Sequence, residues 1–279
     1  MTPRATTGAH RLASRGRLAA LALLVCVTVP RALAVDARST GQAPFDHDHT
    51  AWTHFLQRFV RDGLVDYRGL KASGAGELNA YLRQLASVTA TEYGTWTRQE
   101  QLAFWINAYN AYTIRLVLDH YPLRSIRSIG LLPGAAFRKT FIPMEALRGR
   151  TVSLDIIEHD ILRRELGEPR IHFAIVCASR SCPVLRDEAY RAQDLGAQLD
   201  DAARRFVRDR SRNWFDAATN TFHASSIFKW FRGDFERRAG SLASFLARYA
   251  EDGAADALRA GGVRIEFLDH DHDWSLNER

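Results

Sequence analysis

The stretch LAFWINAYNAYTIRLVL, residues 102–118, is the most apolar part of the chain. Across residues 101–120 apolar side chains fall on nearly every side of a helical wheel, which predicts a helix that is buried all round. Pro122 marks its end. Asn107 and Asn110 share one face of this helix. Because an unpaired buried amide costs about 1–3 kcal/mol, we expect both side chains to be hydrogen-bonded.

Shorter elements are predicted on both sides of this helix, with irregular backbone over 71–76 and much of 123–150. No internal repeat or low-complexity linker divides them. The pattern predicts one α+β domain over residues 45–279, rich in helices and with a small, mostly antiparallel sheet. The expected helices are 49–62, 77–87, 153–166, one beginning near Pro183, 194–209, one capped by Ser225 or Ser226, and 241–260, and the expected extended segments are 65–67, 141–143, 171–177, 222–224 and 263–268.

The N-terminal segment predicts export. Residues 1–34 carry arginines but no acid, an apolar run over 18–29 and small residues at a cleavage spacing, which is typical of a secretory signal peptide. Residues 35–44 are expected to be a flexible lead-in. Val25 before Cys26 argues against a lipoprotein cleavage site. The mature chain is therefore expected in the periplasm or outside the cell, without a membrane span.

Charge excludes some classes of partner. The full chain has a formal net charge of +6, but the segment 1–34 holds five arginines and no acid, so the mature chain carries about +1. Such a balanced surface gives no support for a nucleic-acid or anionic-membrane partner.

The stretch HFAIVCASRSCPVL, residues 172–185, brings two cysteines close together. Cys182 directly precedes Pro183, and proline favours the first position of a helix. At such a helix start, unpaired amides would lower the pKa of the thiol. Arg180 and Arg186 add positive charge nearby. This combination favours a nucleophilic thiolate.

A disulfide between Cys177 and Cys182 is the alternative. The mature chain has only these two cysteines, and an oxidising compartment favours their pairing. The intervening residues 178–181 can turn back and bring the Cα atoms within the roughly 4.4–6.8 Å that a bridge requires. Two inert thiols are a third possibility, and the sequence leaves all three open.

A thiolate would also need partners. His159 and His172 are candidate bases, Glu158 falls on the apolar arc of its helix and could orient a histidine, and Asn107 or Asn110 could donate to an oxyanion. A structural alternative stands beside each role. Buried histidines, carboxylates and amides of this kind also form hydrogen-bond networks that only hold the fold together.

Two runs rich in Asp and His, residues 46–49 and 269–273, lie near the ends of the mature chain. They match no dedicated ligand spacing, so a solvated surface with weak metal affinity is expected. We predict no metal centre and no other cofactor. Residues 273–277 are expected to close the chain structurally.

Several motifs together resemble the domain-of-unknown-function family 547 and cover nearly all of the mature chain in order. The resemblance implies a mixed α+β domain found in exported bacterial proteins, without settled biochemistry. The motifs are DHTAW (48–52), GLVDY (63–67), FWINAYNAYT (104–113), SLDIIEHDILR (153–163), PRIHFAIVCASRSCP (169–183), SIFKWFRGDF (226–235) and DWSLN (273–277).

One position departs from the family pattern, because the family more usually shows an aromatic residue where His272 stands. The chain also resembles papain-like and transglutaminase-like hydrolases distantly, although their cysteine commonly opens the central helix, which here carries asparagines. The family's motif positions in this sequence are Asn107, Asn110, Glu158, His159, His172, Cys177, Cys182, Lys229, Asp234 and Asp273.

Two functional hypotheses follow. The first is a thiol-dependent hydrolase or acyl transferase that acts on peptide-like or amide bonds in the envelope, with Cys182 attacking, His159 or His172 as the base, Glu158 orienting it and Asn107 steadying the oxyanion. The second is a non-catalytic envelope domain that binds a protein, peptide or cell-wall partner, with Cys177 and Cys182 bridged. In the second, Lys229 and Trp230 could belong to a ligand groove, although a helix that packs Trp230 and Phe231 inward would explain them as well.

Overall fold

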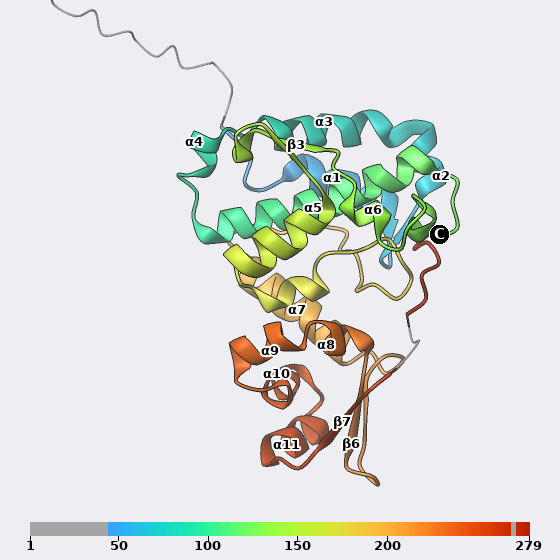
Figure 1. Cartoon of the computed structure of the whole chain (residues 1–279), viewed down its shortest axis with the longest axis vertical. Helices are drawn as coiled ribbons and strands as arrows, with labels where there is room; N and C mark the ends of the chain where they lie inside the picture. The colour runs from blue at the N-terminus through green and yellow to red at the C-terminus, as the bar shows by residue number, and fades with distance from the viewer. Residues whose placement is uncertain (1–43, 269–271) are drawn as a thin grey trace, which may run out of the picture. The chain divides into compact units, whose positions relative to one another are not determined.

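Helix α5 (Arg98–His120) runs through the larger hydrophobic core, and its middle is buried on all sides, as predicted. It lies beside α3 (Ala75–Ser87) in Figure 1. A capping box starts it: the Thr97 hydroxyl accepts the Glu100 N–H at 3.3 Å, and the Thr97 N–H donates to the Glu100 carboxylate at 2.7 Å. The helix ends at the extended residue Tyr121, directly before Pro122.

The structure is a computed structural model that describes residues 44–268 and 272–279. The predicted signal peptide 1–34 and nearly all of the lead-in 35–44 lie outside the described residues. Within the described ranges, no helix has the length and apolar character needed to cross a membrane.

The N-terminal elements pack on one side of α5 (Figure 1). Trp52 stacks between Phe55 and Tyr81, with ring centroids 5.0 and 5.1 Å away. The loop expected at 71–76 is largely a π-helical turn instead. Gly74 lies directly against the Phe59 ring, so its glycine serves close packing rather than a loop. These elements are α1 (Thr50–Phe59), β1 (Val60–Arg61), β2 (Leu64–Val65), α2 (Tyr67–Gly69), η1 (Leu70–Gly74), α3 and α4 (Ala90–Tyr93).

The segment after α5 forms a small hairpin that packs against α3 and a π-helix that packs against α5. β3 and β4 pair antiparallel, with Pro143 opposite Thr151. The expected helix at 153–166 is present as η4, and its side chains Ile157, Ile161 and Leu162 are buried. The elements are η2 (Ile126–Ser128), α6 (Ala135–Arg138), β3 (Ile142–Met144), η3 (Glu145–Leu147), β4 (Arg150–Val152), η4 (Ile156–Glu165) and η5 (Pro169–Phe173).

Two elements predicted around the cysteines do not form. The expected strand 171–177 is the 3-10 helix η5 followed by irregular backbone, and no helix begins at Pro183. Apart from one bridge between Ser179 and Leu276, residues 174–194 contain no helix or strand. Several of their backbone groups are instead bonded by side chains from other parts of the chain.

The C-terminal part surrounds a second core of phenylalanines, among them Phe173, Phe206 and Phe245. Its sheet has the order β5–β6–β7, antiparallel and then parallel. Ser225 caps α8 by accepting the Ile227 N–H at 3.4 Å. The elements are α7 (Leu195–Val207), β5 (Trp214–Asp216), β6 (Thr221–Ala224), α8 (Ser226–Trp230), α9 (Arg232–Ala239), α10 (Leu242–Tyr249), α11 (Asp252–Ala260) and β7 (Arg264–Phe267).

The single helix expected at 241–260 is two helices, α10 and α11. Ala250 is extended between them. The Arg208 guanidinium donates to the carbonyls of Tyr249 and Ala250 at 2.9 and 3.1 Å, and so satisfies the end of α10. The predicted fold class is confirmed: the protein is α+β and rich in helices. In the described part of the chain, its strands form three small, mostly antiparallel sheets rather than one.

Candidate functional site

Cys177 and Cys182 form a disulfide, with 2.15 Å between the sulfurs and 6.2 Å between the Cα atoms. The disulfide predicted as one alternative is thus confirmed. Cys182 is not a free thiol in this structure, and the backbone after Pro183 is not helical. The argument that a helix start lowers the pKa of the Cys182 thiol is therefore wrong.

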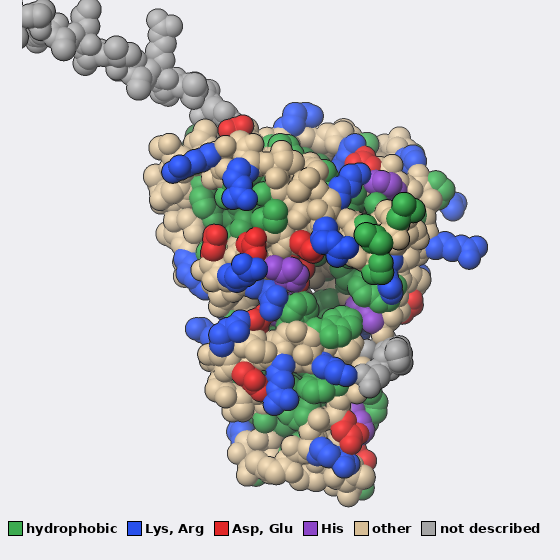
Figure 2. Space-filling model, in the orientation of Figure 1, with side chains coloured by type: hydrophobic (Ala, Val, Ile, Leu, Met, Phe, Trp, Pro, Cys, Tyr) green, Lys and Arg blue, Asp and Glu red, His purple; other side chains and the backbone are tan. Residues whose placement is uncertain are grey.

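The disulfide lies in the wall of a pocket of about 220 Å³. Figure 2 shows a hollow on this face, bordered by hydrophobic and histidine side chains, between the regions of α6 and α8. The candidates Glu158, His159 and His172 line the same pocket. Much of the remaining lining is aromatic or aliphatic, and includes Phe137, Ile175, Ile227, Trp230, Phe231 and Trp274.

Glu158 is the acidic group most affected by this apolar environment. Its side chain is only 15% exposed, and the Tyr109 hydroxyl donates to it at 3.3 Å. Burial raises the pKa of Glu158 from 4.5 to about 7, although the Tyr109 hydrogen bond and the charge of Arg163 oppose the shift. The carboxyl group can therefore gain or lose a proton near neutral pH.

His159 faces the pocket as a neutral imidazole. The Arg163 guanidinium donates to its Nδ1 at 3.0 Å, and this nitrogen must therefore be unprotonated. Burial and the charge of Arg163 lower the pKa of His159. Its Nδ1 lies 3.8 Å from the Glu158 carboxylate. The two neighbours Glu158 and His159 thus place a carboxyl group and a neutral imidazole on one wall.

His172 is held by a hydrogen bond and by a ring contact. Its Nε2 donates to the Asp234 carboxylate at 2.8 Å, and its ring stacks on Phe231 with centroids 3.8 Å apart. Burial lowers the pKa of His172 to about 4, against the effect of Asp234. Because Asp234 occupies Nε2, that nitrogen has a structural hydrogen bond and is not directed at a sulfur.

Asn107 and Asn110 do not line the pocket. Each carboxamide closes two hydrogen bonds with the backbone, as expected for buried amides. Asn107 bonds to the carbonyl and N–H of Tyr190 at 2.7 and 3.0 Å. Asn110 bonds to the Ala174 carbonyl and the Val176 N–H at 2.9 and 2.8 Å. The proposed oxyanion role of Asn107 therefore lacks support, since its carboxamide does not line the pocket and bonds to the backbone of Tyr190.

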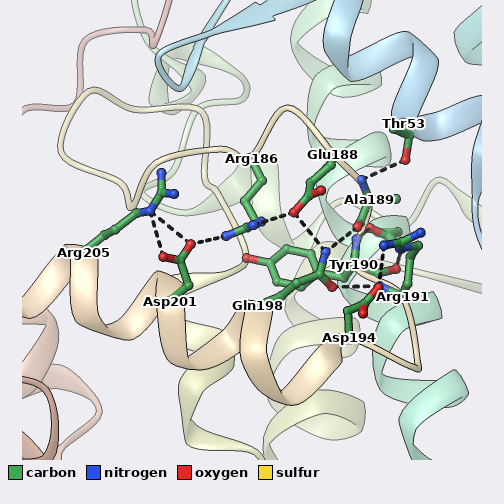
Figure 3. Close-up of polar contacts among 11 residues, drawn as sticks. Thr53, Arg186, Glu188, Ala189, Tyr190, Arg191, Asp194, Gln198, Asp201 and Arg205 are labelled. Atoms are coloured by element: carbon green, nitrogen blue, oxygen red, sulfur yellow. Dashed lines mark hydrogen bonds and ion pairs between the residues drawn. The ribbon is translucent and has the colours of Figure 1, made fainter.

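The irregular segment after Pro183 is held by side chains, as Figure 3 shows. Thr53 accepts the Ala189 N–H at 3.1 Å, and Gln198 bonds to the Ala189 carbonyl and the Arg191 N–H, both at 2.9 Å. Arg186 forms ion pairs with Glu188 and Asp201. These two carboxylates balance the charge of Arg186. The expectation that Arg186 stabilises a Cys182 thiolate is therefore not supported.

Ser179 and His272 are neighbours of the disulfide that the sequence did not identify. The Ser179 hydroxyl lies 3.1 Å from the Cys182 sulfur, 3.4 Å from the Cys177 sulfur and 2.9 Å from His272 Nε2. The position of Ser179 between the two cysteines was a signal that could have been used. His272 had been noticed in the run 269–273 and as a departure from the family pattern, but it had not been connected with the cysteines.

The C-terminal segment closes the chain beside the disulfide. The Asp273 N–H donates to the Ser181 hydroxyl at 2.7 Å, and the Ser181 N–H donates to the Asp273 carbonyl at 3.2 Å. Asn277 accepts the Tyr67 hydroxyl at 3.1 Å. The Asp273 carboxylate also accepts the Ser275 N–H at 2.8 Å, and the predicted structural closure over 273–277 is present. Lys229 is exposed on α8 and does not line the pocket.

The run at 46–49 leads into the start of α1. The Asp46 carboxylate accepts the N–H groups of Asp48 and Thr50, and buried His49 bonds through Nδ1 to the Tyr81 hydroxyl at 2.7 Å. Asp269, His270 and Asp271 of the second run lie outside the described residues. Among the described residues, the atoms that could hold a metal ion are the sulfurs of Cys177 and Cys182 with a ring nitrogen of His272, all within 4.8 Å.

A family model described as "Protein of unknown function, DUF547" matches residues 93–207, which contain α5, η4, η5, the disulfide loop and α7. Comparisons with curated proteins and with solved structures found no match. The resemblance inferred from the motifs is thereby confirmed over residues 93–207, where the chain matches the protein family of unknown function DUF547.

Proposed function

We propose that this exported chain binds a peptide-like ligand of the envelope in the pocket beside the Cys177–Cys182 disulfide. The observation that carries the proposal is the composition of the pocket: aromatic walls with a carboxyl group and a neutral imidazole side by side. Pockets of this kind hold an apolar group and fix its orientation through a few polar contacts. Glu158 and His159 suit the N–H and carbonyl groups of an amide.

Trp230 marks the entrance of this pocket. Its side chain is 50% exposed although it is large and apolar, and its ring lies 5.5 Å from that of His272. Exposed aromatic groups beside a concavity commonly contribute to binding. An aromatic side chain of the ligand is expected to stack on Trp230.

Removal of the Trp230 ring is expected to weaken binding of an N-acetylated alanyl-phenylalanine amide at least about tenfold, or about 1.4 kcal/mol. Titration calorimetry on the oxidised full chain measures this. Trp214→Ala is the matched control, because Trp214 is 39% exposed and lies on β5 outside the pocket. Equal affinity of wild type and Trp230→Ala would refute the proposed site.

A second candidate is thiol-dependent hydrolysis or acyl transfer by the reduced protein. It is favoured by the two donors at the Cys182 sulfur, the Cys177 N–H at 3.0 Å and the Ser179 hydroxyl at 3.1 Å. Such donors stabilise a thiolate. The thiolate would attack an amide carbonyl and form a thioester, while the departing amine would take a proton from the Glu158 carboxyl. Water would then release the acyl group and supply the proton that restores this carboxyl group.

The variant Cys177→Ser separates this candidate from simple binding, because it frees Cys182 without a reductant. We expect iodoacetamide to modify Cys182 in this variant and in the reduced wild type, but not in the oxidised wild type. The free thiol should also release p-nitroaniline from an acyl-phenylalanine anilide, and Cys182→Ser should not. A folded Cys177→Ser protein that is labelled but turns over no amide would leave only the binding function.

A further inference from the structure

Three metal-binding side chains meet at one point although they are far apart in sequence. Cys177 and Cys182 lie in the loop after η5, and His272 belongs to the C-terminal segment, yet their donor atoms lie within 4.8 Å of one another. Backbone hydrogen bonds clamp the two segments together: the Arg180 N–H donates to the Ser275 carbonyl at 2.9 Å, and the two bonds between Ser181 and Asp273 flank His272 directly. These bonds hold the segment that carries His272 against the loop that carries the two cysteines.

We propose that reduction of the disulfide turns this cluster into a binding site for a zinc-like divalent ion, held by the two sulfurs and His272. A dithiol supplies the two electrons and two protons that open the S–S bond, and is itself oxidised to a disulfide. The ion then displaces the two thiol protons to solvent. Metal binding is thus controlled by the redox state of the cysteines.

The donor set selects the ion. Two thiolates and one imidazole suit Zn²⁺, which binds sulfur at about 2.3 Å and nitrogen at about 2.0–2.1 Å with tetrahedral geometry. Two thiolates around such an ion lie about 3.8 Å apart, so the sulfurs must separate from their bonded distance, which only reduction permits. The present Cα separation of 6.2 Å leaves room for this movement by side-chain rotation.

Ser179 supplies the outer contact that such a site needs. Its side chain is almost fully buried, and its hydroxyl lies within 3.4 Å of both sulfurs and of His272 Nε2. In the metal-bound state the hydroxyl can donate to a thiolate, as outer-shell groups do in zinc sites. Three protein ligands leave a fourth position, and both cysteines and His272 line the pocket, so this position faces the pocket.

Cobalt(II) is the probe that tests the proposal. The full chain carrying Cys26→Ser has Cys177 and Cys182 as its only cysteines. After reduction it should bind one Co²⁺ per chain, with a thiolate-to-cobalt charge-transfer band and the intense visible bands of tetrahedral cobalt. Zinc should displace the cobalt, and bound metal should protect both thiols from iodoacetamide. The oxidised protein should show none of these signals.

His272→Gln should weaken cobalt binding at least about a hundredfold, more than the loss of an outer-shell contact alone. His223→Gln is the matched control. His223 lies in β6, where its ring stacks on Trp214 of β5, and it is not part of this cluster. Both histidine variants keep both cysteines, so folding can be checked by circular dichroism. Cobalt bands of equal intensity in the oxidised protein, unchanged affinity of His272→Gln, or a reduced chain that binds no cobalt would each overturn the proposal.

Discussion

Replacement of Asp234 by alanine is expected to lower the free energy of unfolding by about 3–5 kcal/mol, because it leaves buried partners without their counter-ion. The carboxylate of Asp234 on α9 is buried and accepts hydrogen bonds from Arg163 of η4 at 2.6 Å and from His172 of η5 at 2.8 Å. Arg237 pairs with its other oxygen. One carboxylate thus joins three elements behind the pocket.

Urea unfolding at pH 7 measures this loss. Asp160→Ala is the control, because Asp160 forms an i,i+4 pair with Arg164 that is largely exposed, and such pairs contribute only about 0.3–0.5 kcal/mol. Asp234→Asn should fall between the two, since its carbonyl oxygen can still accept from His172 but carries no charge. A loss below about 1 kcal/mol for Asp234→Ala would show that the network is not needed for stability.

The central helix and the behaviour of its asparagines could be predicted from sequence. An apolar run on all sides of α5 has only one stable environment, the core, and two carboxamides placed there must find partners. What the sequence could not show was the identity of those partners. Asn107 and Asn110 bond to backbone groups at positions 174, 176 and 190, and these contacts depend on the tertiary path of the chain.

The strand predicted at 171–177 does not form, and the reason again lies in tertiary contacts. An alternation of Phe173, Ile175 and Cys177 predicts a strand, but the whole segment is buried or nearly so, and alternation then carries no information about which face meets water. Asn110 takes the Ala174 carbonyl and the Val176 N–H, groups that a neighbouring strand would otherwise bond. A side chain can thus replace a strand partner, and local sequence does not reveal this.

The disulfide pocket could be predicted only in part. Cys177, Cys182, Glu158, His159 and His172 were identified as candidates because each type is chemically active, and they do line one pocket. The roles given to them depended on local helix geometry at Pro183, which tertiary contacts override. The approach of His272 to the disulfide arises from backbone bonds between two segments about ninety residues apart, and no local pattern encodes it.

Replacement of Glu158 by glutamine is expected to stabilise the protein by about 2–3 kcal/mol at pH 8. In the unfolded chain the carboxyl loses its proton near pH 4.5, whereas in the fold it keeps the proton until about pH 7. The folded state therefore binds more protons between these values, and the free energy of unfolding falls as the pH rises through this window. Each pKa unit corresponds to about 1.4 kcal/mol, and the remaining exposure of the side chain reduces the total.

Glutamine removes the ionisation but keeps an oxygen that can accept the Tyr109 hydroxyl. The difference in unfolding free energy between Glu158→Gln and wild type should thus be near zero at pH 4, rise between pH 4.5 and 7, and stay constant above. Urea unfolding over this pH range measures it. Glu165→Gln is the control on the same helix, because its carboxylate is exposed and meets water in both states. A Glu158→Gln difference that is independent of pH would mean that the fold does not raise the pKa of this carboxyl group. Glu158 would then not be available as a protonated partner for an amide beside His159.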